Sequence, residues 1–162
     1  MARQKNALRG HFIAPYKTGI SETEVTEDTV MELAKWIKDI SDDTDEKTED
    51  EAYYDGDGTE ETTVVGVKGA YTFEGTYDPE DKAQAHIASL KYKLGDERKV
   101  WHLIVAADGK KQWLGVATVT EIIAGSGAAA DFEAFGCKIT YNTLPKESSE
   151  MTLKKKEKNF EM

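Results

Sequence analysis

Alternation of apolar and polar residues dominates the chain from residue 62 onward. In the segment TTVVGVKGAYTFEGTYD, residues 62–78, the large apolar side chains Val65, Val67, Tyr71 and Phe73 share one parity. This spacing is typical of a half-buried strand, and Gly69 in its middle predicts a bulge or bend. Two further β runs, 98–106 and 112–123, flank a turn that contains Asp108-Gly109 and together predict a hairpin. Residues 132–144 are the last predicted strand.

A helical pattern is clear at one place and ambiguous at another. The run Asp78-Pro79-Glu80-Asp81 has the features of a helix start, and Gly95 is a stop signal, so we expect a helix over about 79–94. In residues 30–40 the apolar positions match helical spacing slightly better than strand alternation. The pattern alone therefore leaves this second segment open between helix and strand.

These elements predict a mainly β fold, a β-sandwich or partly closed barrel of two antiparallel sheets with one flanking helix. We expect a single domain over 30–145, preceded by an N-terminal arm, 1–29, and followed by a flexible charged tail, 146–162. A long acidic segment, 43–62, interrupts the domain, and its many carboxylates predict a solvated loop.

The negative charge of the chain is concentrated in this acidic segment. The formal net charge is −10, and residues 42–61 hold eleven acids against the single base Lys47. The remaining residues are therefore neutral overall, and the first 17 residues are basic. A nucleic-acid reader normally carries a basic stripe, so the charge distribution argues against that function class.

We find no motif that predicts catalysis, a cofactor or a metal. The three histidines, His11, His86 and His102, lie in unlike settings, and Cys137 falls on an apolar strand parity typical of a buried residue. The run Tyr53–Glu61 contains Asp-Gly-Asp-Gly, but no register supplies the full ligand set of a calcium loop, so we interpret it as a turn. No apolar run is long enough to span a membrane, and no signal sequence is evident.

The aromatic residues are expected to pack in the core, with one exception. Tyr53 and Tyr54 stand side by side between acidic runs and have no core of their own to reach, so they predict an interface. The core-packing expectation covers the other large aromatic side chains, Trp36, Trp101, Trp113, Tyr71, Tyr77, Tyr92 and Tyr141.

In this order, the parts of the chain resemble a known family. Five parts follow one another along the chain: the segment AKWIKDISDDTDEKTEDEAYYDGDGT, a β run that ends in EGTYD, the helix PEDKAQAHIASL, the hairpin VWHLIVAADGKKQWLGVATVTEI and the final strand GSGAAADFEAFGCKITYNTLP. Together they are similar to the major tail protein, the tail tube protein, of long non-contractile-tailed phages. The resemblance covers roughly 33–145.

This resemblance implies a structural, non-enzymatic virion protein whose subunits form stacked hexameric rings around a conduit for DNA ejection. It implies a strand at about 35–42. The implied partners are further copies of the chain and other tail proteins, namely tape measure, distal tail and terminator proteins, while genomic DNA passes without sequence-specific binding and no membrane is involved. The implied location is the virion tail, after assembly in the host bacterial cytoplasm.

The two opposite charge blocks suggest how such subunits would join. We hypothesise that the acidic segment of one subunit pairs with the basic arm of a neighbour, and that the adjacent tyrosines belong to the same interface. The predicted interface residues are Arg3, Lys5, Arg9, Asp43, Asp45, Glu46, Glu49, Asp50, Glu51, Tyr53 and Tyr54. Two alternatives stay open: a carbohydrate- or cell-surface-binding β-sandwich module that uses exposed aromatics, and a small calcium-dependent domain.

Overall fold

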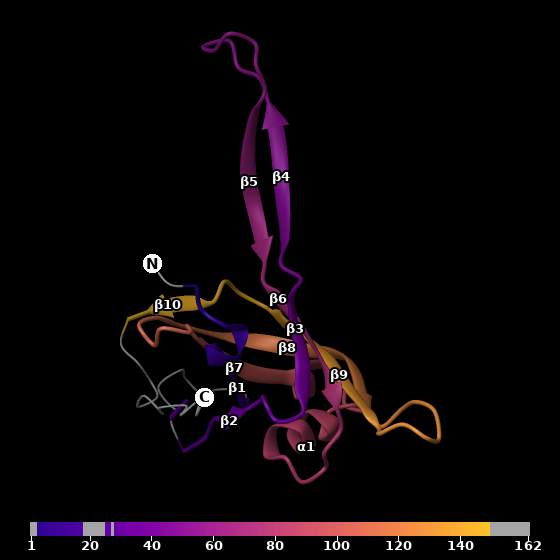
Figure 1. The fold of residues 1–162 in the computed structure, drawn as a ribbon. Helices are drawn as coiled ribbons and strands as arrows, with labels where there is room; N and C mark the ends of the chain where they lie inside the picture. The colour runs from indigo at the N-terminus through magenta and orange to yellow at the C-terminus, as the bar shows by residue number, and fades with distance from the viewer. Residues whose placement is uncertain (1–2, 18–24, 27, 150–162) are drawn as a thin grey trace.

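A computed structural model describes residues 3–17, 25–26 and 28–149, and this part of the chain is mostly β-strand around one α-helix (Figure 1). The predicted mainly β class with a flanking helix is confirmed. The expectations for residues 18–24 and for the C-terminal tail from residue 150 onward lie outside the described residues. In chain order the elements are η1 (Asn6–Leu8), β1 (Gly10–Pro15), β2 (Met31–Glu32), β3 (Ile37–Asp42), β4 (Asp45–Glu51), β5 (Glu61–Lys68), β6 (Ala70–Thr76), α1 (Lys82–Ser89), η3 (Gly95–Arg98), β7 (Lys99–Val105), β8 (Gln112–Ala124), β9 (Ala134–Tyr141) and β10 (Lys146–Ser148).

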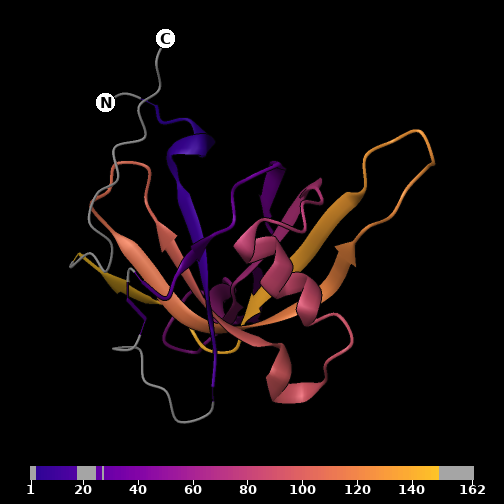
Figure 2. The ribbon, with the colours of Figure 1, turned by 90° about the horizontal axis from the view of Figure 1, so that it is seen from below.

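Eight of the strands form one antiparallel sheet in the order β2-β1-β7-β8-β9-β6-β3, with β10 paired to the end of β8. The sheet curls into a half-barrel, and Figure 2 shows α1 lying inside the curve. Glycines permit close contacts where the sheet bends: a Cβ on Gly115 would lie 2.9 Å from the Tyr141 ring. The remaining two strands, β4 and β5, form a separate antiparallel pair.

Both faces of the curled sheet are covered in its centre. On the concave face, Ala83, Ile87 and Leu90 from the helix pack into the main apolar core. On the opposite face a smaller cluster contains Ala14, Val25, Trp101, Leu103 and Leu114. Burial on both faces explains why β7 is buried continuously from Val100 to Ile104 instead of at alternate residues.

The N-terminal prediction is wrong for part of its length. Residues 10–15 were expected to lie in an arm outside the core, but they form β1, which pairs with β7 along its whole length, and Ile13 is fully buried. Likewise Lys146–Ser148, expected to lie in a flexible tail, forms β10 against β8. Both segments are short, and their strand pairing depends on partners that are distant in sequence.

Two local predictions near the helix are refined. The ambiguous segment forms strand β3, in agreement with the strand expected at 35–42; Trp36 just before it has a φ of 64°, which no regular helix contains. The helix begins later than expected, because Asp81 and not Asp78 is its N-cap: the Asp81 carboxylate accepts a hydrogen bond from the Gln84 backbone N–H at 3.2 Å. It also ends earlier than expected, with Leu90 as its C-cap.

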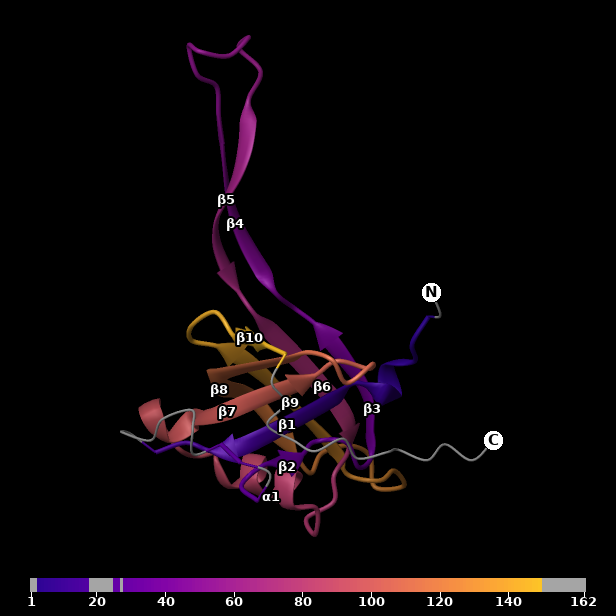
Figure 3. The same cartoon turned by 90° about the vertical axis from the view of Figure 1, so that its left-hand side faces the viewer.

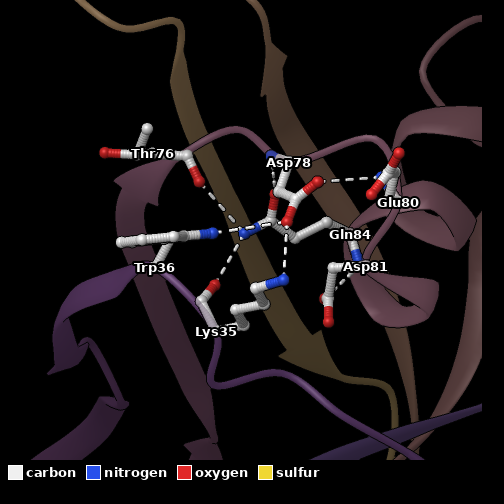
Figure 4. Close-up of polar contacts among 7 residues, drawn as sticks. All are labelled: Lys35, Trp36, Thr76, Asp78, Glu80, Asp81 and Gln84. Carbon is white, nitrogen blue, oxygen red and sulfur yellow. Dashed lines mark hydrogen bonds and ion pairs between the residues drawn. The ribbon is translucent and has the colours of Figure 1, made fainter.

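A buried glutamine joins this helix to the sheet (Figure 4). The Gln84 side chain is fully buried. Its Oε1 accepts a hydrogen bond from the Asp78 N–H at 2.6 Å, and its Nε2 donates to the Lys35 and Thr76 carbonyl oxygens at 2.9 and 3.1 Å. One side chain thus satisfies three backbone groups from two separate segments, which fixes α1 in the curve of the sheet.

The Asp78 carboxylate organises the surface above Gln84 (Figure 4). It accepts hydrogen bonds from the Glu80 N–H at 2.9 Å and from the Trp36 indole at 3.3 Å, and it forms an ion pair with Lys35 at 3.0 Å. The hydrogen bond from Glu80, followed by the contact with Lys35, holds the pKa of Asp78 below its usual value. Gly75 is required beside this cluster, because a Cβ there would lie 2.1 Å from the Trp36 carbonyl oxygen.

Two histidines lie together in the core. His11 Nδ1 and His102 Nε2 are 3.4 Å apart, and both side chains are buried. The rings of Tyr71 and Phe73 from β6 contact both histidines, and Tyr141 from β9 contacts His102. Burial, with a smaller effect of His11, lowers the pKa of His102 well below its ordinary value.

Replacing Gln84 by methionine should lower the free energy of unfolding by roughly 2–3 kcal/mol, because the backbone groups that Gln84 satisfies lose their partners. Chemical denaturation followed by tryptophan fluorescence measures this. Lys82→Met, on the exposed side of the same helix, is the matched control and should change it by less than about 0.5 kcal/mol. Equal effects of the two substitutions would contradict the anchoring role of Gln84.

The buried histidine pair should make the fold sensitive to acid. His102 is neutral in the folded state, whereas the unfolded chain takes up a proton near pH 6.5. The unfolded state therefore binds more protons at acid pH, and the free energy of unfolding should fall below that pH by up to about 1.4 kcal/mol per pH unit for this group. Denaturation between about pH 8 and pH 5 tests this, since this range spans the ordinary histidine pKa of about 6.5 on both sides.

His102→Gln should flatten this pH dependence, whatever its effect on stability at neutral pH. His86→Gln is the comparison, because burial lowers the pKa of His86 as well but this side chain is only partly buried. An unchanged slope in the His102 variant would show that the acid sensitivity arises elsewhere.

Candidate subunit interface

The acidic segment is a projecting β-hairpin and not the predicted loop. Strands β4 and β5 pair in antiparallel fashion from Asp45↔Lys68 to Glu51↔Glu61, and this ribbon rises from the body of the molecule (Figures 1 and 3). Its charged strand, DEKTEDE, has little strand propensity of its own. It is extended because the β-branched strand ETTVVGVK pairs with it.

Almost every residue of this hairpin is exposed. All of β4 and all but one residue of β5 are exposed along their full lengths. The predicted single strand over 62–78 is thus two strands in different sheets, and Val65 and Val67 are exposed while Tyr71 and Phe73 are part of the body. An isolated two-stranded ribbon is marginally stable in water, so this hairpin lacks the packing that normally supports such an element.

The base of the hairpin is tied to the curled sheet. Asp43 donates its N–H to the Ala70 carbonyl at 2.9 Å, and its carboxylate accepts a hydrogen bond from the Thr72 hydroxyl. On the other strand, the Tyr141 N–H donates to the Gly69 carbonyl at 2.7 Å. A Cβ on Gly69 would lie 2.9 Å from the Tyr141 ring, so glycine allows the chain to pass from the ribbon into β6 at this point.

The two faces of the hairpin differ in character. Opposite residues of an antiparallel pair share a face, and successive residues alternate. One face therefore holds the pairs Glu46–Val67, Thr48–Val64 and Asp50–Thr62, and we call it the valine face. The other is the charged face, and it holds Asp45, Lys47, Glu49, Glu51, Glu61, Thr63 and Lys68.

The tip of the hairpin, residues 52–60, carries the adjacent tyrosines. Tyr54 is completely exposed, with a relative exposure of 109%, and Tyr53 is also exposed. The tip turns through Gly58, whose φ is 90°, and the Asp57 carboxylate accepts hydrogen bonds from Thr59. These hydrogen bonds to the carboxylate lower the pKa of Asp57.

The structure brings together the acidic and aromatic members of the predicted interface. Asp45, Glu46, Glu49, Asp50 and Glu51 all lie on β4, Tyr53 and Tyr54 lie at the tip, and Asp43 lies at the base. The basic members do not pair with them within the molecule. Arg3, Lys5 and Arg9 are exposed at and around η1, and among the described residues the ion pairs join Lys35–Asp78, Lys99–Asp96 and Lys111–Glu147 only.

Several exposed apolar residues were not singled out from the sequence. Trp36 and Tyr92 were expected in the core, but Trp36 is mostly exposed and Tyr92 is 88% exposed. Leu94 and Phe132 are also exposed, whereas Trp101 and Tyr141 are buried as expected. The signal for Tyr92 was its position in Lys91-Tyr92-Lys93-Leu94, where lysines on both sides mark the exposed end of a helix.

The described residues contain no group of three or more His, Cys, Asp and Glu side chains arranged to hold a metal ion. Cys137 is a buried free thiol, as its strand position predicted. In the same part of the chain, no helix has the length and apolar character needed to cross a membrane.

Neither a protein-family model nor a curated protein matches this chain. Its fold does match solved structures. A chain from the tail of an empty GTA particle, determined with C6 symmetry, has a TM-score of 0.63 at 12% identity over 90% of this chain and 99% of that one. A chain from the virion of a native gene transfer agent (GTA) particle has a TM-score of 0.61 at 10% identity, over 85% and 95%.

A third similar structure is the cap that terminates the tube of the anti-feeding prophage, with a TM-score of 0.53 at 11% identity over 93% of each chain. In all three cases the likeness extends over nearly the whole of both chains. The chain therefore has the fold of proteins from phage-like tails, as the sequence resemblance predicted.

Proposed function

We propose that this protein is a structural subunit of a phage-type tail tube, which self-assembles into stacked hexameric rings that form a conduit for DNA ejection. The observation that carries the proposal is the full-length fold match with a chain from a tail of C6 symmetry. A tail subunit needs contacts with its neighbours and no catalytic site. The exposed hairpin, which extends from the body with no packing of its own, supplies a surface for such contacts.

The charge distribution supports the conduit role. A tube through which DNA slides must not hold phosphates, and basic side chains hold them by releasing counterions. The neutral body and the acidic hairpin together give a net charge of −10, so a ring of such subunits repels a duplex. The protein would then act in the virion tail after assembly in the host cytoplasm, beside tape measure, distal tail and terminator proteins.

The hairpin is the element that the proposal assigns to contacts between subunits. The interface includes its carboxylates, Asp43 at its base, and Tyr53 and Tyr54 at its tip, and the exposed Arg3, Lys5 and Arg9 of a neighbour provide positive charge for the charged face. A carbohydrate-binding module remains the competing function. The exposed aromatics that it could use, Trp36, Tyr92 and Phe132, lie on three different connections of the body. The solved structures that share this fold come from tails, virions and a tube cap, which favours the structural role.

Purified full-length protein at high concentration should form rings or tubes with a central hole in negative-stain electron microscopy. A variant in which residues 45–67 are replaced by a short glycine turn should remain folded and monomeric, because β4 and β5 form a sheet of their own. Its melting temperature should stay within about 4 °C of the parent protein. Rings formed equally well without the hairpin would contradict its role, and a parent protein that stays monomeric while binding glycans would favour the module.

Neutralising the hairpin should change the salt dependence of assembly. Replacing Asp43, Asp45, Glu46, Glu49, Asp50 and Glu51 by their amides removes the charge that attracts basic residues of a neighbour. We expect the parent protein to assemble less well as salt rises from about 0.05 to 0.5 M, and the amide variant to assemble weakly at every salt concentration. Sedimentation of polymers measures this. Normal tubes with unaltered salt dependence in the variant would rule out the charge pairing.

A further inference from the structure

The turn that follows α1 is an exposed patch with a composition opposite to that of the hairpin. It runs from Leu90 to Leu94 in the sequence Leu-Lys-Tyr-Lys-Leu, and we call it the KYKL turn. Tyr92 is 88% exposed and Leu94 is 82% exposed, so two large apolar side chains stand in solvent beside two lysines. Exposed apolar side chains rimmed by charge are characteristic of interaction sites.

The guanidinium group of Arg98 holds this turn in place. Arg98 donates from Nε to the Lys93 carbonyl at 2.8 Å, from Nη1 to the Val119 carbonyl at 3.3 Å, and from Nη2 to the Lys91 carbonyl. The guanidinium thus connects both ends of the turn to strand β8. A turn fixed before binding loses less conformational entropy when a partner orders it, which favours a role in recognition.

The lysines of the turn are available to a partner. Lys99, the next base along the chain, is already in an ion pair with Asp96 at 2.9 Å. In the described part of the chain, no ion pair involves Lys91 or Lys93. Lys91 Nζ lies 5.6 Å from the centre of the Tyr92 ring, so the aromatic side chain is held beside positive charge.

The valine face of the hairpin has the complementary set of groups. Val64 and Val67 are exposed apolar side chains, and Glu46 and Asp50 flank them on the same face. Among the residues paired across the hairpin, the charged face has no exposed apolar side chain to match Tyr92 and Leu94, and the exposed Val65 lies at the register shift and belongs to neither set of pairs. Of the paired residues, those of the valine face therefore combine apolar surface with carboxylates at the spacing of neighbouring strand residues.

Within one molecule these two surfaces are kept apart. The hairpin leaves the body on one side, and α1 lies on the opposite side in both lateral views (Figures 1 and 3). A contact between them must join two copies, and it joins different surfaces of the two, so it can repeat from copy to copy.

We infer that the valine face of the β4–β5 hairpin docks on the KYKL turn of a second copy of this chain. Val64 and Val67 contact Tyr92 and Leu94, and Glu46 and Asp50 face Lys91 and Lys93. This inference rests on the proposed self-assembly and adds the pair of surfaces that meet. It leaves the charged face of the hairpin for the basic N-terminal residues.

Disulfide trapping between two differently tagged full-length chains tests the contact. One chain carries Leu94→Cys, and the other carries Thr48→Cys on the valine face or Thr63→Cys on the charged face. The two threonines are a matched pair, since both are exposed and lie at comparable heights on the ribbon. The native Cys137 does not interfere, because burial raises the pKa of its thiol to about 12.

In assembled rings or tubes, the Thr48→Cys chain should form the mixed disulfide at least roughly fivefold more efficiently than the Thr63→Cys chain, because a disulfide requires closely approaching Cβ atoms. Adding Lys93→Glu to the Leu94→Cys chain should lower the yield roughly threefold, and Glu46→Lys on the Thr48→Cys chain should restore it.

The outcomes separate the two proposals. If tubes form but both threonine positions cross-link equally or not at all, the docking inference is overturned while the tail-tube function stands. If Lys5→Cys in place of Leu94→Cys captures Thr48→Cys preferentially, the occupant of the valine face is the N-terminal segment and the inference is also wrong. If the parent protein forms neither rings nor tubes, the proposed function fails first, and the docking inference falls with it.

Discussion

The structure is dominated by one unfavourable feature: a two-stranded ribbon, β4 and β5, projects into solvent and packs against no hydrophobic core. Ordering each residue costs about 1–2 kcal/mol of backbone entropy, and burial of apolar area normally compensates for this cost. Strands β4 and β5 bury almost nothing. Their ladder hydrogen bonds and the threonine contact of Asp50 offset only part of the cost. In the proposed assembly, a partner surface that covers the ribbon supplies the rest of the stabilisation.

The rest of the molecule provides the firm base that such a ribbon needs. The curled sheet buries both faces near β7, and Gln84 fixes the helix within its curve through three backbone groups. The hairpin continues from β3 and β6, which are neighbours in this sheet, so its direction is set by packed strands.

The sequence predicted the elements whose apolar residues are buried. It predicted less well those strands whose conformation depends on pairing with another strand. The strands 98–106 and 112–123, the helix start near Pro79 and the burial of Cys137 follow from local patterns, and the structure confirms them with small shifts. The charged run DEKTEDE has no apolar face, so local propensity correctly placed it in solvent but could not show that it is a strand. Its partner strand imposes that conformation.

The exposed residues of the candidate interface could likewise be predicted only in part from local sequence patterns. The tyrosines at 53 and 54 were recognised because acidic neighbours left them no core. Tyr92 was not, because an aromatic residue near the end of a helix usually packs inward, whereas here it lies exposed in the turn whose Lys91 and Lys93 carbonyls Arg98 holds. In the same way, the short strand Gly10–Pro15 carries no strong pattern, and its place in the sheet depends on β7, which lies about ninety residues further along the chain.

The location of the charge also restricts how copies can associate. Exposed strand edges invite pairing with identical edges, and charged side chains on them oppose it. Here the acids lie on the ribbon itself, so two hairpins that approach each other repel, and a symmetric hairpin-to-hairpin dimer is disfavoured. The body is neutral overall and presents lysines near α1, so in the proposed assembly each hairpin meets a different surface of the next molecule. Contacts between unlike surfaces do not end with two copies; they close into rings or continue as filaments, which are the two kinds of assembly that a tube requires.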